Sequence, residues 1–141
     1  MSSGLPAIGA IVAGKYRIEA LLGEGGMGAV FRARHQLMDK PVAIKWLHPR
    51  FWDHGEARER FVREARAAAR IRHPNVLEVF DVCVEPHALF MVMELIEGDT
   101  LEALLERAEL SVPRALSLVL DAMHGVAAAH ARGIIHRDIK P

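Results

Sequence analysis

The chain has 141 residues, a length typical of one domain or of part of a larger one. Hydrophobic residues make up 51% of the chain and charged residues 26%, a globular composition that excludes disordered and fibrous proteins. Lys and Arg together number 18, as do Asp and Glu, so the formal net charge is zero. This balance excludes a strongly basic nucleic-acid-binding surface and a polyacidic tail.

The cysteine and histidine patterns predict neither a disulfide nor a metal site. Cys83 is the only cysteine, so no internal disulfide can form, and no Cys/His spacing typical of zinc sites occurs. We therefore expect no metal-ligating residue within the chain and a reducing, cytoplasmic location.

Neither a signal peptide nor a membrane span is predicted. Residues 5–14 are apolar, but no Lys or Arg precedes them. The apolar stretch over residues 115–131 contains Asp121 and His124 and is short for a span. We expect residues 1–14 to be a flexible leader and the later stretch to be a buried helix.

Three strands are predicted in succession with no helix between them, which indicates an antiparallel meander. The first alternates over residues 16–22 and stops at a glycine cluster, residues 23–28. The second alternates over residues 29–35, and the third covers residues 42–47 after a turn at 38–41.

A helix and two further strands complete the first part of the chain. The helix is predicted over residues 55–71 and ends at His73-Pro74. The strands are predicted over residues 76–84 and 88–95. We therefore expect an α+β fold that begins with a five-stranded antiparallel sheet and one helix.

The rest of the chain is predicted to be helical. Asp99 or Thr100 can cap a short helix. Ser111 can cap a long one, with Pro113 in its first turn and Gly133 just past its end. This long helix is apolar nearly all round, so we expect the isolated chain to expose an apolar patch and to associate.

The glycine cluster Gly23-x-Gly25-x-x-Gly28 is typical of a phosphate-binding loop. Glycines let backbone N–H groups approach phosphate oxygens closely. A dinucleotide-binding loop opens directly into a helix, whereas this cluster leads into a predicted strand. We therefore interpret it as a flap over a nucleotide, with an ordinary glycine turn as the alternative.

Lys45 and Glu64 form a second candidate site. Lys45 lies on an otherwise apolar strand. Glu64 lies in the apolar stripe of the following helix, whose apolar residues fall within about 60° of it on a helical wheel. An unpaired carboxylate that faces a sheet is costly, so Lys45 is its expected partner. Arg60 is the rival partner, and a solvated edge lysine is the alternative role of Lys45.

The same helix is rich in arginine, which raises the alternative of a nucleic-acid-binding face. Glu56 and Glu59 lie four residues before Arg60 and Arg63, the ordinary i,i+4 spacing of exposed ion pairs. This spacing favours a solvated helix face, and we expect no nucleic-acid partner.

The chain ends with His136-Arg137-Asp138-Ile139-Lys140-Pro141. One interpretation is a charged loop after a helix. The other is chemical, because an aspartate can accept a hydroxyl proton while a neighbouring lysine neutralises a phosphate.

Five motifs together closely resemble the eukaryotic-type protein kinase family in its bacterial serine/threonine branch. They are residues 23–30, residues 42–45, Glu64, residues 73–75 and residues 136–141. Lys140, two residues after Asp138, is similar to serine/threonine rather than tyrosine kinases. The resemblance implies a kinase N-lobe over residues 15–96 and the start of an incomplete helical C-lobe over residues 97–141.

The resemblance also implies site residues, ATP and Mg²⁺ as cofactors, and a protein substrate. The glycine loop would cover the ATP phosphates, and Lys45, held by Glu64, would contact the α- and β-phosphates. Asp138 would orient or deprotonate the substrate hydroxyl, and Lys140 would reach the γ-phosphate. The residues assigned to ATP are Leu22, Gly23, Glu24, Gly25, Gly26, Met27, Gly28, Ala29, Val30, Ala43, Lys45, Glu64, Met93, Glu94 and Ile96.

Among these, Leu22, Val30 and Ala43 would line the adenine, with Met93 as gatekeeper. The Glu94 carbonyl and the Ile96 amide would bond to the adenine edge along the hinge.

The sequence also departs from the family. The magnesium-binding Asn and the Asp-Phe-Gly motif would lie beyond Pro141. We therefore expect the intact parent protein to phosphorylate Ser/Thr hydroxyls and these 141 residues alone to be inactive. The alternatives are a non-catalytic, nucleotide-binding regulatory module and a small-molecule phosphotransferase. Relatives often continue into a membrane anchor, on which this sequence carries no information.

Overall fold

The computed structural model describes residues 4–52, 54–136 and 139–141. The chain forms two compact units, each described by itself below. The first comprises Met1–Arg70 and Glu78–Leu95, and the second comprises Ile71–Leu77 and Ile96–Pro141.

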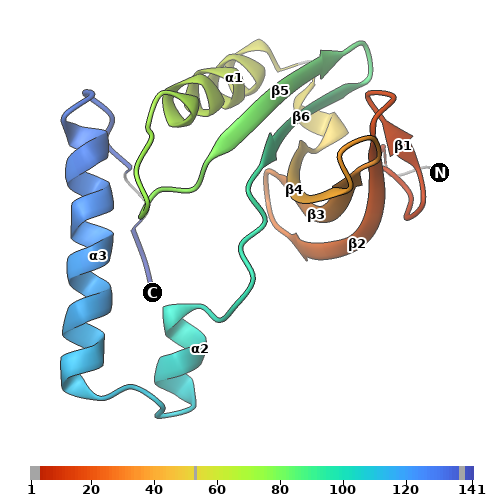
Figure 1. The fold of residues 1–141 in the computed structure, drawn as a ribbon. Coiled ribbons are helices and arrows are strands. Elements are labelled where there is room, and N and C mark those ends of the chain that lie inside the picture. Colours follow the sequence, from red (N-terminus) through yellow and green to blue (C-terminus); the bar gives the residue numbers. More distant parts are fainter. Residues whose placement is uncertain (1–3, 53, 137–138) are drawn as a thin grey trace. The chain divides into compact units, whose positions relative to one another are not determined.

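The first unit is built on an antiparallel sheet with the strand order β1-β2-β3-β4-β6-β5 (Figure 1). Its described residues form six strands rather than the predicted five. The strands are β1 (Ile11–Val12), β2 (Tyr16–Glu24), β3 (Gly28–His35), β4 (Lys40–Leu47), β5 (Val79–Glu85) and β6 (Ala88–Met93).

The sixth strand, β1, comes from the segment that was expected to be a flexible leader. Ile11 and Val12 pair with Arg17 and Tyr16 of β2. The Gly9 N–H donates to the Ile18 carbonyl at 2.8 Å, and the Ile18 N–H donates to the Ala10 carbonyl at 2.9 Å. The prediction of a loose leader is therefore wrong for residues 9–12. Two strand residues are too few to give an alternating pattern in the sequence.

The hydrophobic core lies on one face of the sheet because side chains alternate along each strand. In β3 the buried and half-buried positions alternate without interruption from Gly28 to His35. Trp46 and Phe90 stack within the core, with ring centroids 4.7 Å apart and an interplanar angle of 4°. The core residues are Tyr16, Ile18, Ala29, Phe31, Ala33, Val42, Ile44, Trp46, Ala88, Phe90 and Val92.

The sheet curls strongly about this core, as the bent β2 in Figure 1 shows. Lys15 precedes β2, near one edge, whereas Asp81 lies on β5, at the other edge. Nevertheless the Lys15 Nζ donates to Asp81 Oδ2 at 3.3 Å. The two sides of the sheet therefore approach each other, which encloses the apolar face between them.

A short 3-10 helix, η1 (Pro49–Phe51), and the helix α1 (Gly55–Ala69) follow β4. The Trp52 indole N–H donates to the Leu47 carbonyl at 3.1 Å and so ties this connection to the strand end. The helix packs against β5 and buries Phe61 and Ala65.

The second unit contains α2 (Leu101–Glu106) and α3 (Val112–His130). Thr100 and Ser111 cap them: the Thr100 Oγ1 accepts from the Ala103 N–H at 3.1 Å, and the Ser111 Oγ accepts from the Arg114 N–H at 3.4 Å. Both predicted caps are confirmed. Of the two candidates for the first helix, the cap is Thr100 and not Asp99. Several apolar side chains of α3 are exposed, namely Val112, Leu116, Val119, Leu120 and Met123.

Gly28, the first residue of β3, lies directly against β4. Replacing it therefore tests how closely these two strands must pack. A Cβ at this position would lie 2.0 Å from the Trp46 carbonyl oxygen, a backbone atom held in the ladder. We expect Gly28→Ala to lower the free energy of unfolding by about 2–3 kcal/mol, measured by urea denaturation.

Gly26→Ala is the matched control for this substitution, because a Cβ there meets nothing within 4 Å and Gly26 does not have a positive φ. We expect this variant to change stability by less than about 1 kcal/mol. Equal losses in the two variants would show that close packing at Gly28 does not hold the strands.

Candidate functional site

The predicted glycine loop is the tip of the β2–β3 hairpin. The Gly25 N–H donates to the Gly28 carbonyl at 2.8 Å, which closes a tight turn over residues 25–28. A strand follows the turn, as the sequence predicted, so the loop differs from a dinucleotide-binding loop that opens into a helix.

Four of the residues assigned to ATP share one face of the sheet. Val30 lies opposite Lys45 in the β3–β4 register, and Ala43 lies opposite Met93 in the β4–β6 register. All four alternate with core residues, so they project from the face opposite the core cluster. Leu22 lies at the register shift between Leu21 and Gly23, on the exposed part of β2.

The strand β6 leads to the predicted hinge. The Glu94 N–H donates to the Glu78 carbonyl at 2.8 Å, and its carboxylate accepts from the Glu78 N–H at 3.3 Å. These bonds hold Glu94 at the end of the first unit. The Glu94 carbonyl takes no part in them. Ile96 begins the second unit, so the structure gives no geometry between the two hinge residues.

The expected ion pair between Lys45 and Glu64 is not formed in the structure. The Glu64 carboxylate instead accepts from the Arg60 Nε at 2.9 Å, and the two side chains are 52% and 61% exposed. Arg60, the rival partner in the sequence analysis, is therefore the observed one. The helical wheel placed Glu64 on the apolar stripe, but a carboxylate this exposed stays hydrated and needs no buried counter-ion.

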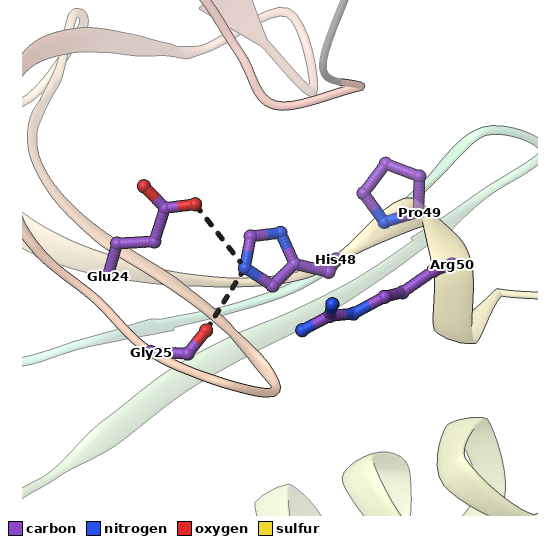
Figure 2. Close-up of a pocket in the computed structure, with 5 residues that line it drawn as sticks. All are labelled: Glu24, Gly25, His48, Pro49 and Arg50. Carbon is purple, nitrogen blue, oxygen red and sulfur yellow. Dashed lines mark hydrogen bonds and ion pairs between the residues drawn. The ribbon is translucent and has the colours of Figure 1, made fainter.

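The structure reveals contacts to the glycine turn that the sequence analysis missed. The segment after β4 forms a cavity of about 330 Å³ with the start of the turn, lined by Glu24, Gly25, His48, Pro49 and Arg50 (Figure 2). The His48 Nε2 lies 3.1 Å from the Gly25 carbonyl and 3.5 Å from a Glu24 carboxylate oxygen.

Arg50 and the backbone of His48 add to this contact. The Arg50 guanidinium donates to the Gly26 carbonyl, and the His48 N–H donates to the Met27 carbonyl at 3.0 Å. The only sequence signal for these contacts was the place of residues 48–50 directly after the third predicted strand. That place is informative only once the strand is known to end beside the turn.

The predicted catalytic residues belong to the end of the chain. Asp138 and Arg137 lie outside the described residues, so the structure gives no geometry for either. Lys140 is described and exposed, in the second unit.

Cys83 is the one thiol of the chain, and its surroundings make it a poor nucleophile. Burial raises its pKa to about 11, and the negative charge of Asp81 acts in the same direction. A thiol with this pKa is almost fully protonated at neutral pH, and the thiolate is the reactive form. Among the described residues, no group of three or more His, Cys, Asp or Glu side chains is placed to hold a metal ion.

The raised pKa of Cys83 predicts that this thiol is alkylated slowly in the folded chain. At pH 8 we expect iodoacetamide to label the folded protein about 10- to 100-fold more slowly than the urea-unfolded protein, because unfolding restores an ordinary thiol pKa. The folded rate should keep rising with pH up to about 11. Mass spectrometry reports this site alone because the chain has one cysteine; equal folded and unfolded rates would contradict the assignment.

Comparison with known proteins identifies the family. Residues 16–141 match the family model described as "Protein kinase domain". Two bacterial relatives are serine/threonine-protein kinase pkn3 of Myxococcus xanthus and serine/threonine-protein kinase PknH of Mycobacterium bovis. The chain is 43% identical to the first over 136 residues and 39% identical to the second over 129 residues. These matches cover 95% and 91% of the chain but only 25% and 22% of the relatives.

Solved structures are also similar to this chain. The kinase domain of PknI from Mycobacterium tuberculosis matches with a TM-score of 0.79 at 33% identity, over 97% of this chain and 57% of that one. The apo form of PpkA-294 matches with a TM-score of 0.85 at 27% identity, over 99% and 56% of the two chains.

The chain therefore belongs to the protein kinase family, and its relatives are bacterial serine/threonine kinases. It has the family's fold, an antiparallel sheet followed by helices, and spans about a quarter of the length of the curated relatives it matches. In the part of the chain that the structure describes, no helix combines the length and hydrophobicity of a membrane span.

Proposed function

We propose that this chain is the ATP-binding part of a serine/threonine protein kinase whose complete form transfers the γ-phosphoryl group of ATP to Ser/Thr hydroxyls of proteins. The observation that carries the proposal is the shared sheet face of Val30, Ala43, Lys45 and Met93 behind the glycine turn. On this face the apolar side chains line the adenine and the Lys45 ammonium meets the phosphates.

The family pattern supports the remaining ATP contacts. The turn and its flanks, residues 22–30, cover the phosphates and one side of the base. The carbonyl of Glu94 and the amide of Ile96 bond to the adenine edge. Glu64 joins Lys45 only if α1 shifts so that the carboxylate leaves Arg60, because in the structure it bonds to Arg60.

We assign catalysis to the last motif of the chain. Asp138 accepts or orients the substrate hydroxyl, and Lys140 neutralises the γ-phosphate. The 141 residues contain no Asp-Phe-Gly triplet, and this family uses such ligands to hold the Mg²⁺ ions that bridge the phosphates. We therefore propose that the chain alone binds nucleotide without transferring phosphate, and that the protein works in the cytoplasm, where ATP and reduced thiols occur together.

The first test removes the Lys45 ammonium from the proposed phosphate site. We expect Lys45→Met to weaken ATP binding, measured by titration calorimetry, by about 10-fold or more, because a charge-assisted contact to phosphate is lost. Stability should change by less than about 1 kcal/mol, since Glu64 already has Arg60 as its partner. Lys40→Met is the matched control at the exposed start of the same strand; equal ATP affinity in the two variants would refute the role of Lys45.

The second test separates catalysis from binding in the full-length protein. We expect Asp138→Asn to lower kcat on the order of 10²–10⁴-fold and to leave the ATP dissociation constant unchanged, because the amide cannot accept the substrate proton. Phosphate transfer from radiolabelled ATP measures the rate. A wild-type protein that binds ATP and transfers nothing would identify a regulatory nucleotide-binding module instead.

A further inference from the structure

The three consecutive carbonyl groups at the tip of the glycine turn are all held by one short segment. His48 Nε2 bonds to the Gly25 carbonyl, the Arg50 guanidinium bonds to the Gly26 carbonyl, and the His48 N–H bonds to the Met27 carbonyl. Figure 2 shows the His48 ring directed at Glu24 and Gly25, with Arg50 beside it.

The direction of these bonds fixes the direction of the N–H groups. Every peptide bond of the described chain is trans, so each carbonyl points opposite to the N–H of the following residue. Carbonyls directed at residues 48–50 therefore turn the N–H groups of Gly26, Met27 and Gly28 away from that segment. Within the described part of the chain, neither the Gly26 nor the Met27 N–H donates a hydrogen bond.

Lys45 and the His48 side chain lie on opposite sides of the segment that β4 begins. His48 continues β4 with an extended backbone, φ −60° and ψ 140°. Side chains alternate along such a backbone, so the His48 side chain projects on the side opposite Lys45. The Gly26 and Met27 N–H groups point away from residues 48–50 and donate no hydrogen bond within the described chain, and adjacent backbone N–H groups can bind an anion.

The bonds from His48 and Arg50 matter because the turn is otherwise flexible. Three of its four residues are glycine, which has more backbone freedom to lose than any other residue. Ordering an unrestrained turn around phosphate costs roughly 1–2 kcal/mol per residue. Bonds already made to His48 and Arg50 remove part of that cost before the nucleotide arrives.

We propose that His48 and Arg50 are positioning residues for ATP, which hold the glycine turn with its N–H groups facing the phosphates. The inference rests on the proposed function, since it assigns these residues to the same nucleotide site. His48 needs a hydrogen on Nε2 for this role, because both groups in reach, the Gly25 carbonyl and the Glu24 carboxylate, are acceptors. The Arg50 guanidinium is further supported by the Phe51 ring, 5.0 Å away.

The test compares ATP with adenosine, which lacks phosphates, in the full-length protein. Gln carries its amide nitrogen as many bonds from the backbone as His Nε2, whereas the Asn side chain is one bond shorter. We expect His48→Asn to raise the dissociation constant of ATP by roughly five- to tenfold and that of adenosine by less than about twofold. His48→Gln should stay within about twofold of wild type for both ligands.

Two further variants complete the design. Arg50→Met keeps the stem beside Phe51 and removes the donor, so it should also weaken ATP binding selectively. His87→Asn, on the exposed β5–β6 turn, is the control for loss of a histidine and should change neither affinity.

The outcomes separate the two proposals. A parallel loss of ATP and adenosine affinity in His48→Asn, or no loss of either, would overturn the positioning role even if ATP binding itself is secure. Failure of the wild-type protein to bind both ligands would overturn the proposed function. Thermal unfolding of each variant identifies any sample that has lost its fold. If His48→Asn is such a sample, a selective loss of ATP affinity in Arg50→Met supports the positioning role, and no selective loss overturns it.

Discussion

The register between β3 and β4 is the constraint on which the rest of the first unit depends. It pairs eight consecutive residues, from Gly28 opposite Leu47 to His35 opposite Lys40, without a bulge. The end of this register farthest from the connecting turn requires glycine at position 28, because any side chain would meet the Trp46 carbonyl. A shift of one residue would exchange the two faces, and would place Lys45 in the core and Trp46 on the face assigned to ATP.

The curled sheet is stabilised by its apolar face more than by the ion pair that joins its two sides. Lys15 and Asp81 are 40% and 39% exposed, and pairs with this exposure contribute little in water. Trp46 stacked on Phe90 is 5% exposed, and its stacking partner is fully buried. Burial of such aromatic side chains is the larger favourable contribution. Lys45 can therefore lie on the opposite face, because the stability of the sheet comes mainly from its apolar face.

The sequence predicted the parts of the molecule whose signals are local. The alternation of β3, the caps at Thr100 and Ser111, and the strand after the glycine cluster all follow from neighbouring residues. The errors concern features set by packing between distant segments. Ile11 and Val12 are a strand only because β2 offers a free edge. Glu64 lies on the apolar side of an ideal wheel, yet the wheel does not say how far that side turns from the sheet. His48 and Arg50 have no recognisable pattern until the strand register brings them beside the turn.

These errors change the physical basis of the proposed nucleotide site. The sequence argument made the site depend on an acid that requires a buried amine, and the structure removes that requirement, because Glu64 is hydrated and bonded to Arg60. What remains of the proposed site is a turn whose carbonyls are held by residues 48–50, and a strand that carries Lys45. Both features depend on β4 and the residue that follows it: Lys45 lies on the strand, and His48 continues it with an extended backbone. β4 and the η1 segment that follows it therefore place the groups that we propose face the phosphates, and α1 packs against η1.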